Sequence, residues 1–114
     1  TIAIMKHDKL RFVEKVDFIT TPGYLTGPGA REEAGLPPGT GPYRVVTTLA
    51  VMGYDKQSKR MKLLATQPGV SVDQVLENTG FELLLADEIT VNQAPSAEEL
   101  TTLREEVDKK KFYI

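Results

Sequence analysis

Glycines between residues 22 and 42 are the first residues whose type and spacing suggest chemistry. A loop that binds phosphate needs glycines at fixed positions before a helix, so that backbone N–H groups can approach the anion. Gly27 and Gly29 lack a glycine at the required later position, Arg44 stands there after Gly39 and Gly41, and no Gly-Lys-Ser/Thr ending exists. We therefore predict that these glycines serve the flexibility of the loop.

Acidic pairs and one histidine are the remaining candidates for chemistry. Adjacent carboxylates point in different directions on a helix and to opposite faces on a strand, so they do not converge on one cleft. His7 is the only imidazole, which leaves a zinc site or a Ser-His-Asp triad without partners, and we predict a surface or capping role for it. No catalytic residue and no metal site is predicted from spacing. The acidic pairs, predicted to be solvated, are Glu32-Glu33, Asp87-Glu88, Glu98-Glu99 and Glu105-Glu106.

Composition narrows the class of protein. The chain has 114 residues and a formal net charge of −2, which fits one domain and gives no positive field to attract nucleic acid. The longest apolar runs, such as residues 83–86, are far shorter than a membrane-spanning helix. Without cysteine there is no disulfide or thiolate site, as is usual for cytoplasmic proteins. We expect one cytoplasmic domain that binds neither nucleic acid nor membrane.

The first part of the chain, residues 1–42, is predicted to form short strands and a helix followed by a long loop. Alternation predicts a strand over residues 1–6, and Asp8 is a good cap for a helix over residues 9–15. Residues 16–20 are β-branched and aromatic, which favours a second strand. Residues 22–42 contain six glycines and five prolines, so we predict a long loop that is either mobile or functional.

The second half carries stronger signals. Residues 43–54 are apolar on both alternating faces, which predicts a strand covered on both sides and paired in an antiparallel hairpin with residues 60–66. Ser71 with Gln74 forms a capping box at the start of a helix that Gly80 is placed to end in a left-handed conformation. A buried strand over residues 81–86 follows, and Ser96 with Glu99 caps a last helix.

Four separated blocks then carry a family resemblance. They are RFVEKVDFITTPGY, REEAGLPPGTGPYRVVTTLAVMGYD, QPGVSVDQVLENTGFELLLADE and SAEELTTLREEVD. In this order they resemble the C-terminal half of the B-subunit of family I coenzyme A transferases, of the glutaconate CoA-transferase type. The resemblance implies an open, mainly parallel α/β sheet with flanking helices, part of the NagB/RpiA-like fold. The start at Thr1, without Met and inside an expected strand, favours a processed or truncated boundary.

The resemblance also implies a mechanism. In the family, a glutamate carboxylate attacks an acyl-CoA thioester to give an anhydride, and then holds CoA as a glutamyl thioester. That glutamate and a glycine-rich oxyanion loop belong to the half that this chain does not resemble. Glu33-Ala34-Gly35 imitates the local pattern at the wrong block position, so we predict that Glu33 is not the nucleophile. No residue is assigned as catalytic, and coenzyme A is expected as a substrate of the full enzyme, not as a bound cofactor.

Five loop residues are the candidates for lining a cleft or a subunit interface: Gly23, Tyr24, Gly41, Pro42 and Tyr43. The expected partners are an A-type subunit or the remainder of the B-subunit, with a homo-oligomer as a further possibility. The leading hypothesis is a segment that supports CoA transfer and is inactive alone. The alternatives are a stand-alone binding or assembly module that has lost catalysis, and a small nucleotide or phosphate binder suggested only by the fold class.

Overall fold

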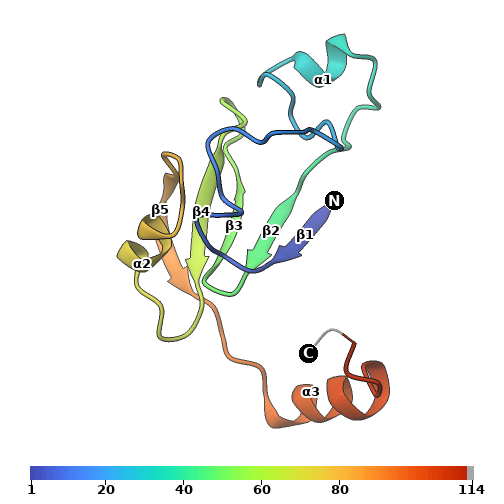
Figure 1. Ribbon diagram of the computed structural model, residues 1–114, viewed down its shortest axis with the longest axis vertical. Helices are drawn as coiled ribbons and strands as arrows, with labels where there is room; N and C mark the ends of the chain where they lie inside the picture. Colours follow the sequence, from blue (N-terminus) through green and yellow to red (C-terminus); the bar gives the residue numbers. More distant parts are fainter. Residues whose placement is uncertain (113–114) are drawn as a thin grey trace.

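A computed structural model describes residues 1–112, which form an open five-stranded sheet with helices at its margins (Figure 1). The strands lie side by side in chain order, and they are β1 (Ile2–Met5), β2 (Arg44–Thr47), β3 (Ala50–Tyr54), β4 (Met61–Thr66) and β5 (Leu84–Val91). The helical segments are α1 (Ala30–Glu33), α2 (Val72–Glu77), α3 (Ala97–Thr102) and the π-helical η1 (Leu103–Val107). No helix within residues 1–112 has the length and apolar character needed to cross a membrane.

The predicted α/β class with flanking helices is confirmed, and the sheet is mixed. The β1–β2 and β4–β5 pairs are parallel, whereas the β2–β3 and β3–β4 pairs are antiparallel. Parallel pairs require long crossover connections, which the chain provides between β1 and β2 and between β4 and β5. The other two connections are tight turns, so parallel pairing accounts for half of the sheet and not for most of it.

Residues 43–54, predicted as one strand, form two. The hydroxyl oxygen of Thr47 accepts hydrogen bonds from the backbone N–H groups of Leu49 (3.2 Å) and Ala50 (2.9 Å), and this contact reverses the chain between β2 and β3. The residues on both sides of the turn are apolar, so the hydrophobic pattern runs through it without a break. The single-strand prediction was therefore wrong.

The predicted hairpin between β3 and β4 is confirmed. Its turn is closed by Asp55, whose carboxylate accepts from the N–H groups of Gln57 (3.1 Å) and Ser58 (2.9 Å) and from the Ser58 hydroxyl (3.0 Å). The Ser58 N–H, followed by the Lys62 ammonium, holds the pKa of Asp55 well below its usual range. Asp55 is therefore an ionised structural residue of the turn.

Helix α2 begins where the sequence predicts. The Ser71 side chain accepts from Gln74 N–H (3.2 Å), the Gln74 side chain accepts from Ser71 N–H (2.9 Å), and Val75 is fully buried under the sheet. The predicted end was wrong, because the helix stops at Glu77 and Gly80 does not adopt a left-handed conformation.

We expect Ser71→Ala to lower the free energy of unfolding by about 1 kcal/mol, since the N–H of Gln74 loses its partner. Ser96→Ala is the matched control: Ser96 forms the same capping box on α3, whose contacts are chiefly with η1 rather than with the core. Urea denaturation followed by circular dichroism measures both variants. An equal loss of global stability in the two would contradict this account of how α2 supports the core.

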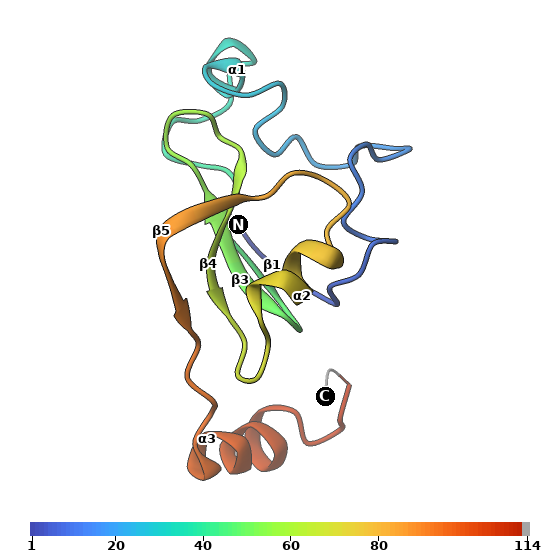
Figure 2. The same ribbon diagram turned by 90° about the vertical axis from the view of Figure 1, so that its left-hand side faces the viewer.

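The core lies on one face of the sheet, where α2 and the segment of residues 7–20 cover the strands (Figure 2). Its buried apolar residues are Phe12, Val45, Ala50, Met52, Leu63, Val75 and Leu83. The predicted helix over residues 9–15 is a single turn at Asp8, which accepts from the N–H groups of Arg11 and Phe12. The predicted strand over residues 16–20 was also wrong: this stretch crosses outside the sheet and exposes Val16, Phe18 and Ile19.

His7 is part of this core, which corrects its predicted surface or capping role. Only 4% of the residue is exposed, and its ring stacks on Phe12 at 4.1 Å between centroids. Its ring nitrogens lie 3.0 Å from the Thr47 hydroxyl and 2.9 Å from the Thr79 hydroxyl. Since the Thr79 hydroxyl donates to the Val75 carbonyl (2.7 Å), it accepts from Nε2–H of His7. Burial lowers the pKa of His7, and the nearby Asp8 opposes this only in part.

The C-terminal elements follow the prediction with shifted limits. The buried strand predicted over residues 81–86 is β5, which begins at Leu84 and runs to Val91. The prediction of burial was wrong, because β5 is an edge strand whose side chains are half-buried or exposed. The Ser96 side chain accepts from Glu99 N–H (3.2 Å), as predicted for the start of α3. Helix α3 then passes into η1 below the sheet (Figure 1).

Candidate functional site

The glycine- and proline-rich loop is folded by its own turns beyond one end of the sheet (Figure 1). Leu25 N–H donates to the Pro22 carbonyl (2.9 Å), and a further turn leads into α1, a helix that the sequence did not predict. Gly29 caps α1 with φ 78°. That backbone conformation strongly favours glycine, which explains its presence in terms of chain geometry rather than phosphate binding.

Arg31 joins the beginning and the end of this loop by hydrogen bonds, which we call the Arg31 brace. Its guanidinium donates to the Gly23 carbonyl (2.6 Å) and to the Thr40 hydroxyl (2.8 Å), which in turn donates to the Pro37 carbonyl (2.6 Å). Gly41 lies so close that a Cβ there would be 3.1 Å from the Arg31 Cζ, and its φ is +121°. Residue 41 must therefore be glycine, because the Arg31 side chain leaves little room for a Cβ and because other residues rarely adopt this φ angle.

Tyr24 joins the loop to the sheet. Its hydroxyl donates to the Pro42 carbonyl (2.7 Å), and its ring makes an edge contact with Tyr54 of β3 at 5.0 Å. The Lys59 ammonium lies 5.6 Å from the centre of the same ring. Burial and the neighbouring Tyr24 raise the pKa of Tyr54, so its hydroxyl stays protonated at neutral pH. The hairpin turn and the loop therefore meet around an aromatic pair.

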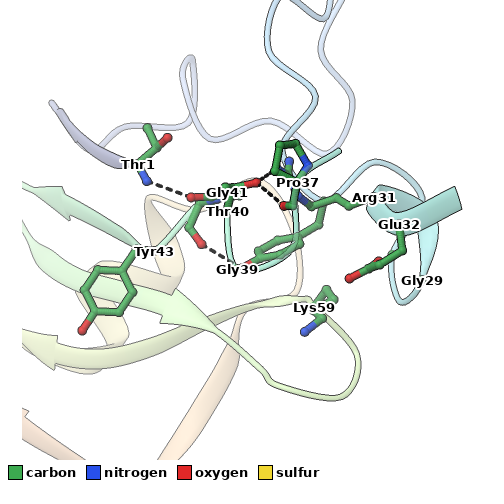
Figure 3. Close-up of a pocket in the computed structure, with 13 residues that line it drawn as sticks. Thr1, Gly29, Arg31, Glu32, Pro37, Gly39, Thr40, Gly41, Tyr43 and Lys59 are labelled. Carbon is green, nitrogen blue, oxygen red and sulfur yellow. Dashed lines mark hydrogen bonds between the residues drawn. The ribbon is translucent and has the colours of Figure 1, made fainter. Parts of the chain in front are cut away.

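Two adjoining pockets open at this meeting point. One, of about 730 Å³, lies between the loop and the hairpin turn (Figure 3), and the other, of about 700 Å³, lies over the ends of β3 and β4. Tyr24, Pro42 and Tyr43 line both, and Gly41 lines the first. Gly23 lines neither pocket and contributes the carbonyl that Arg31 binds. The structure thus brings the five candidate residues into one region.

Positive charges outnumber acids on the pocket walls. The first pocket has Arg31 and Lys59 against Glu32, with Lys59 and Glu32 on one side of it (Figure 3). In the second, Lys62 is paired with Asp55 at 3.2 Å, and the Arg44 guanidinium lies 4.1 Å from the centre of the Tyr43 ring. Aromatic faces next to cations suit a ligand or peptide that carries anionic groups and flat apolar surface.

Within residues 1–112, the side chains that line the two pockets are arranged for binding a ligand rather than for catalysis. Glu33 is exposed and lines neither pocket, so it stands away from the site. The hydroxyl–imidazole contacts of His7 with Thr47 and Thr79 are buried in the core. No group of three or more His, Asp or Glu side chains within residues 1–112 is placed to hold a metal ion.

Sequence reasoning missed three residues of this region: Arg31, Tyr54 and Lys59. Arg31 is a lone cation inside a run of glycines and prolines, and this contrast is a usable signal for a brace that binds backbone carbonyls. Tyr54 and Lys59 reach the site from the β3–β4 hairpin, and nothing local in the sequence indicates that this turn meets the loop.

Comparison with known proteins gives a consistent result. The family model for coenzyme A transferase matches residues 1–78. The chain is 42% identical over 114 residues to the B-subunit of glutaconate CoA-transferase from Acidaminococcus fermentans, a match that covers all of this chain and 42% of the relative. It is 36% identical over 103 residues to the B-subunit of 3-oxoadipate CoA-transferase from Pseudomonas knackmussii, a match that covers 90% of this chain and 39% of the relative.

Comparison with solved structures gives the same result as comparison of sequences. The crystal structure of glutaconate coenzyme A-transferase from Acidaminococcus fermentans superposes with a TM-score of 0.88, covering 99% of this chain and 43% of the other. The chain therefore spans about two-fifths of the length of the curated relatives that it matches.

Proposed function

Because the chain belongs to the coenzyme A transferase family, we propose that it is a segment of a B-type subunit that supports transfer of CoA between an acyl-CoA and a carboxylic acid. The observation that carries this proposal is identity along the whole chain to a B-type relative of which it spans 42%. We assign it the role of a single domain corresponding to the C-terminal half of that subunit. It is inactive alone, and coenzyme A is a substrate of the complete enzyme.

Within that enzyme, the braced loop lines a cleft or a subunit interface. Tyr43 supports this role because it is 60% exposed while the Arg44 guanidinium lies against its ring, so a flat charged surface is available. Tyr24, Pro42, Gly41 and Gly23 position that surface through the Arg31 brace and the Tyr24–Pro42 hydrogen bond. Rigid aromatic residues of this kind are frequent anchors in protein interfaces.

The partners in this proposal are the remainder of the B-type subunit and an A-type subunit, in the cytoplasm. The names of the relatives support a second subunit, since each is named as the B-subunit of its enzyme. The alternative is a stand-alone binding or assembly module of the same fold, which would form a homo-oligomer. Light scattering separates the two, because a module of that kind gives a stable oligomer of the 114-residue chain.

The activity test replaces the matched segment of the Acidaminococcus fermentans B-subunit with this chain. We expect the chimera, mixed with the A-type subunit of that enzyme, to transfer CoA from an acyl-CoA to glutaconate, and the 114-residue chain alone to be inactive. Tyr43→Ala in the chimera should lower the rate about fivefold or more, as expected for loss of an interface aromatic. Phe112→Ala is the matched control, since Phe112 is 75% exposed and lines neither pocket.

Two results would overturn the proposal. One is CoA transfer by the chain alone that a single substitution such as Glu33→Gln abolishes, because the catalytic group would then lie within these 114 residues. The other is a folded chimera without activity, since the segment would not be able to replace its counterpart.

A further inference from the structure

Lys59, in the turn between β3 and β4, has a backbone conformation that lysine rarely adopts. Its φ is +59°, in the left-handed region where a Cβ crowds the following carbonyl oxygen. Glycine would fit this position without strain, so the backbone gives no reason for a lysine. The Lys59 side chain lines the first pocket, and its ammonium lies 5.6 Å from the centre of the Tyr24 ring. Strained residues cluster at ligand-binding sites, which makes this side chain a candidate for contact with a ligand.

Arg31 contributes a second positive charge to the same pocket. It is half-buried, and its hydrogen bonds go to uncharged oxygens, the Gly23 carbonyl and the Thr40 hydroxyl. The three ion pairs formed within residues 1–112 involve neither Arg31 nor Lys59. Charges that leave water are usually paired in proteins. Glu32 also lines the pocket, outside ion-pair distance of both cations, so the walls keep an excess of positive charge.

Aromatic and backbone surfaces complete the walls. Tyr24 and Tyr43 line the pocket, and Tyr43 is 60% exposed. Gly39 and Gly41 line it without side chains, so a ligand can approach the backbone there (Figure 3). The volume of about 730 Å³ is within the range of small-molecule sites. One cavity thus offers aromatic surface, free backbone and uncompensated positive charge.

The position of this pocket in the fold is also informative. It lies at the amino ends of β1 and β2, because Thr1 and Tyr43, which line it, directly precede these strands. Ligands of open α/β sheets usually bind beyond the carboxyl ends of the strands. The fold class alone therefore does not predict a ligand here. A ligand in this pocket would contact both the loop of residues 22–42 and the β3–β4 turn.

We propose that this pocket binds a small organic anion in which a planar ring carries a carboxylate or a phosphate group. The Lys59 ammonium binds the anionic group, and the uncompensated charge of Arg31 strengthens the attraction. The ring packs against the tyrosine side chains of the wall, as aromatic pairs do. Carboxylate and phosphate share this chemistry, because both present charged oxygens to an ammonium donor.

Four small compounds test the class of ligand. Phenyl phosphate and benzoate carry both ring and charge, inorganic phosphate lacks the ring, and phenol lacks the charge. Each is titrated into the 114-residue chain, and NMR shifts of the Gly39, Gly41 and Tyr43 amides report where it binds. We expect the better of the two ring anions to bind at least about fivefold more tightly than inorganic phosphate or phenol. Comparison of the two ring anions distinguishes a phosphate from a carboxylate ligand.

Lys59→Gly separates binding from folding. Glycine relieves the left-handed strain, so the unfolding midpoint should be unchanged or raised, although glycine also gives the unfolded chain more freedom. The affinity for the ring anion should fall about fivefold or more, because a charged donor is lost. Lys59→Arg keeps the charge and should keep most of the affinity.

Lys56→Gly is the matched control. Lys56 belongs to the same turn and carries the same charge, but it does not line this pocket and its φ is not positive. Its substitution should lower the unfolding midpoint slightly and change the affinity by less than about twofold.

Glu32→Gln should have the opposite effect to Lys59→Gly. It removes a negative charge from the pocket wall, so the affinity for the ring anion should rise. Glu32 is exposed and makes no ion pair with residues 1–112, so the unfolding midpoint should stay the same.

The proposal fails if the ring anions bind no more tightly than inorganic phosphate, or if the NMR shifts map to another part of the chain. It also fails if Lys59→Gly and Lys56→Gly weaken binding equally, since the attraction would then be a general effect of positive charge in the turn. The titrations use neither CoA nor a second subunit, so their failure leaves the proposed function standing. An inactive chimera together with intact anion binding would contradict only the proposed function.

Discussion

Replacing Gly80 with alanine is expected to lower the free energy of unfolding by about 2–4 kcal/mol, from overpacking together with a lost hydrogen bond. A Cβ at this position would lie 2.4 Å from the carbonyl oxygen of Phe12, which is also the acceptor for Gly80 N–H at 2.6 Å. Both atoms belong to backbone, so the clash is relieved only if residue 12 moves and Phe12 leaves its place in the core. Urea denaturation followed by circular dichroism measures the loss.

Gly53→Ala is the control for this prediction. Gly53 also lacks a left-handed backbone, and a Cβ there would lie 2.9 Å from the Leu64 Cδ1 and 3.0 Å from an Arg44 guanidinium nitrogen. Those are the ends of flexible side chains that can turn aside, so the expected loss is much smaller. Equal losses in the two variants would show that the Gly80–Phe12 contact is not what makes position 80 sensitive.

His7→Ala is expected to destabilise the protein by about 3 kcal/mol, comparable to other large-to-small substitutions in cores. The substitution removes the ring stacked on Phe12 and the partner that joins the Thr47 and Thr79 hydroxyls. Both hydroxyls keep backbone partners, Ala50 and Val75 respectively, so most of the loss comes from packing. Calorimetry of the variant at pH 8 checks this with the imidazole of the wild type neutral.

The buried His7 should also make the stability of the protein depend on pH. The folded pKa of His7 lies below its ordinary value of 6.5, so between these two values the unfolded chain binds more protons than the folded one. The contribution of neutral His7 to the free energy of unfolding should be fully present above about pH 6.5. Below that pH, the free energy of unfolding should fall by at most about 1.4 kcal/mol per pH unit. His7→Gln should flatten this part of the profile. Parallel profiles for wild type and variant between pH 7.5 and 5.5 would contradict the assignment.

Local signals in the sequence predicted the elements that depend on local contacts. The capping boxes at Ser71 and Ser96 are present because the contacts span three residues. The β3–β4 hairpin was predictable for the same reason, since Asp55 closes its turn by binding N–H groups two and three residues away.

The predictions from sequence were wrong where contacts between residues far apart in the chain determine the local structure. His7 is buried because Thr47 and Thr79, 40 and 72 residues away in sequence, satisfy its ring nitrogens. Residues 16–20 have strand-like composition but lie outside the sheet, because the preceding segment crosses the core face to insert Phe12. Gly80 was correctly singled out as special for the wrong reason: it permits a close backbone approach, not a left-handed turn.

The candidate site was predictable in part. Composition marked the loop of residues 22–42, and the family resemblance selected five residues that the structure places in one region. Their role in a cleft or interface stays a prediction for the chimera to test. The hairpin residues Tyr54 and Lys59 were out of reach, because the contact between loop and turn depends on the Tyr24–Tyr54 pair, 30 positions apart in sequence.

The aromatic pair at the pockets has a spectroscopic consequence. The sequence contains no tryptophan and four tyrosines, so ultraviolet emission of the protein comes from tyrosine. Three of the four, Tyr24, Tyr43 and Tyr54, line the two pockets, and the rings of Tyr24 and Tyr54 are 5.0 Å apart. Whatever occupies these pockets alters the surroundings of most of the emitting groups. The native chain therefore carries its own optical reporter of occupancy, and titrations can be followed without a label.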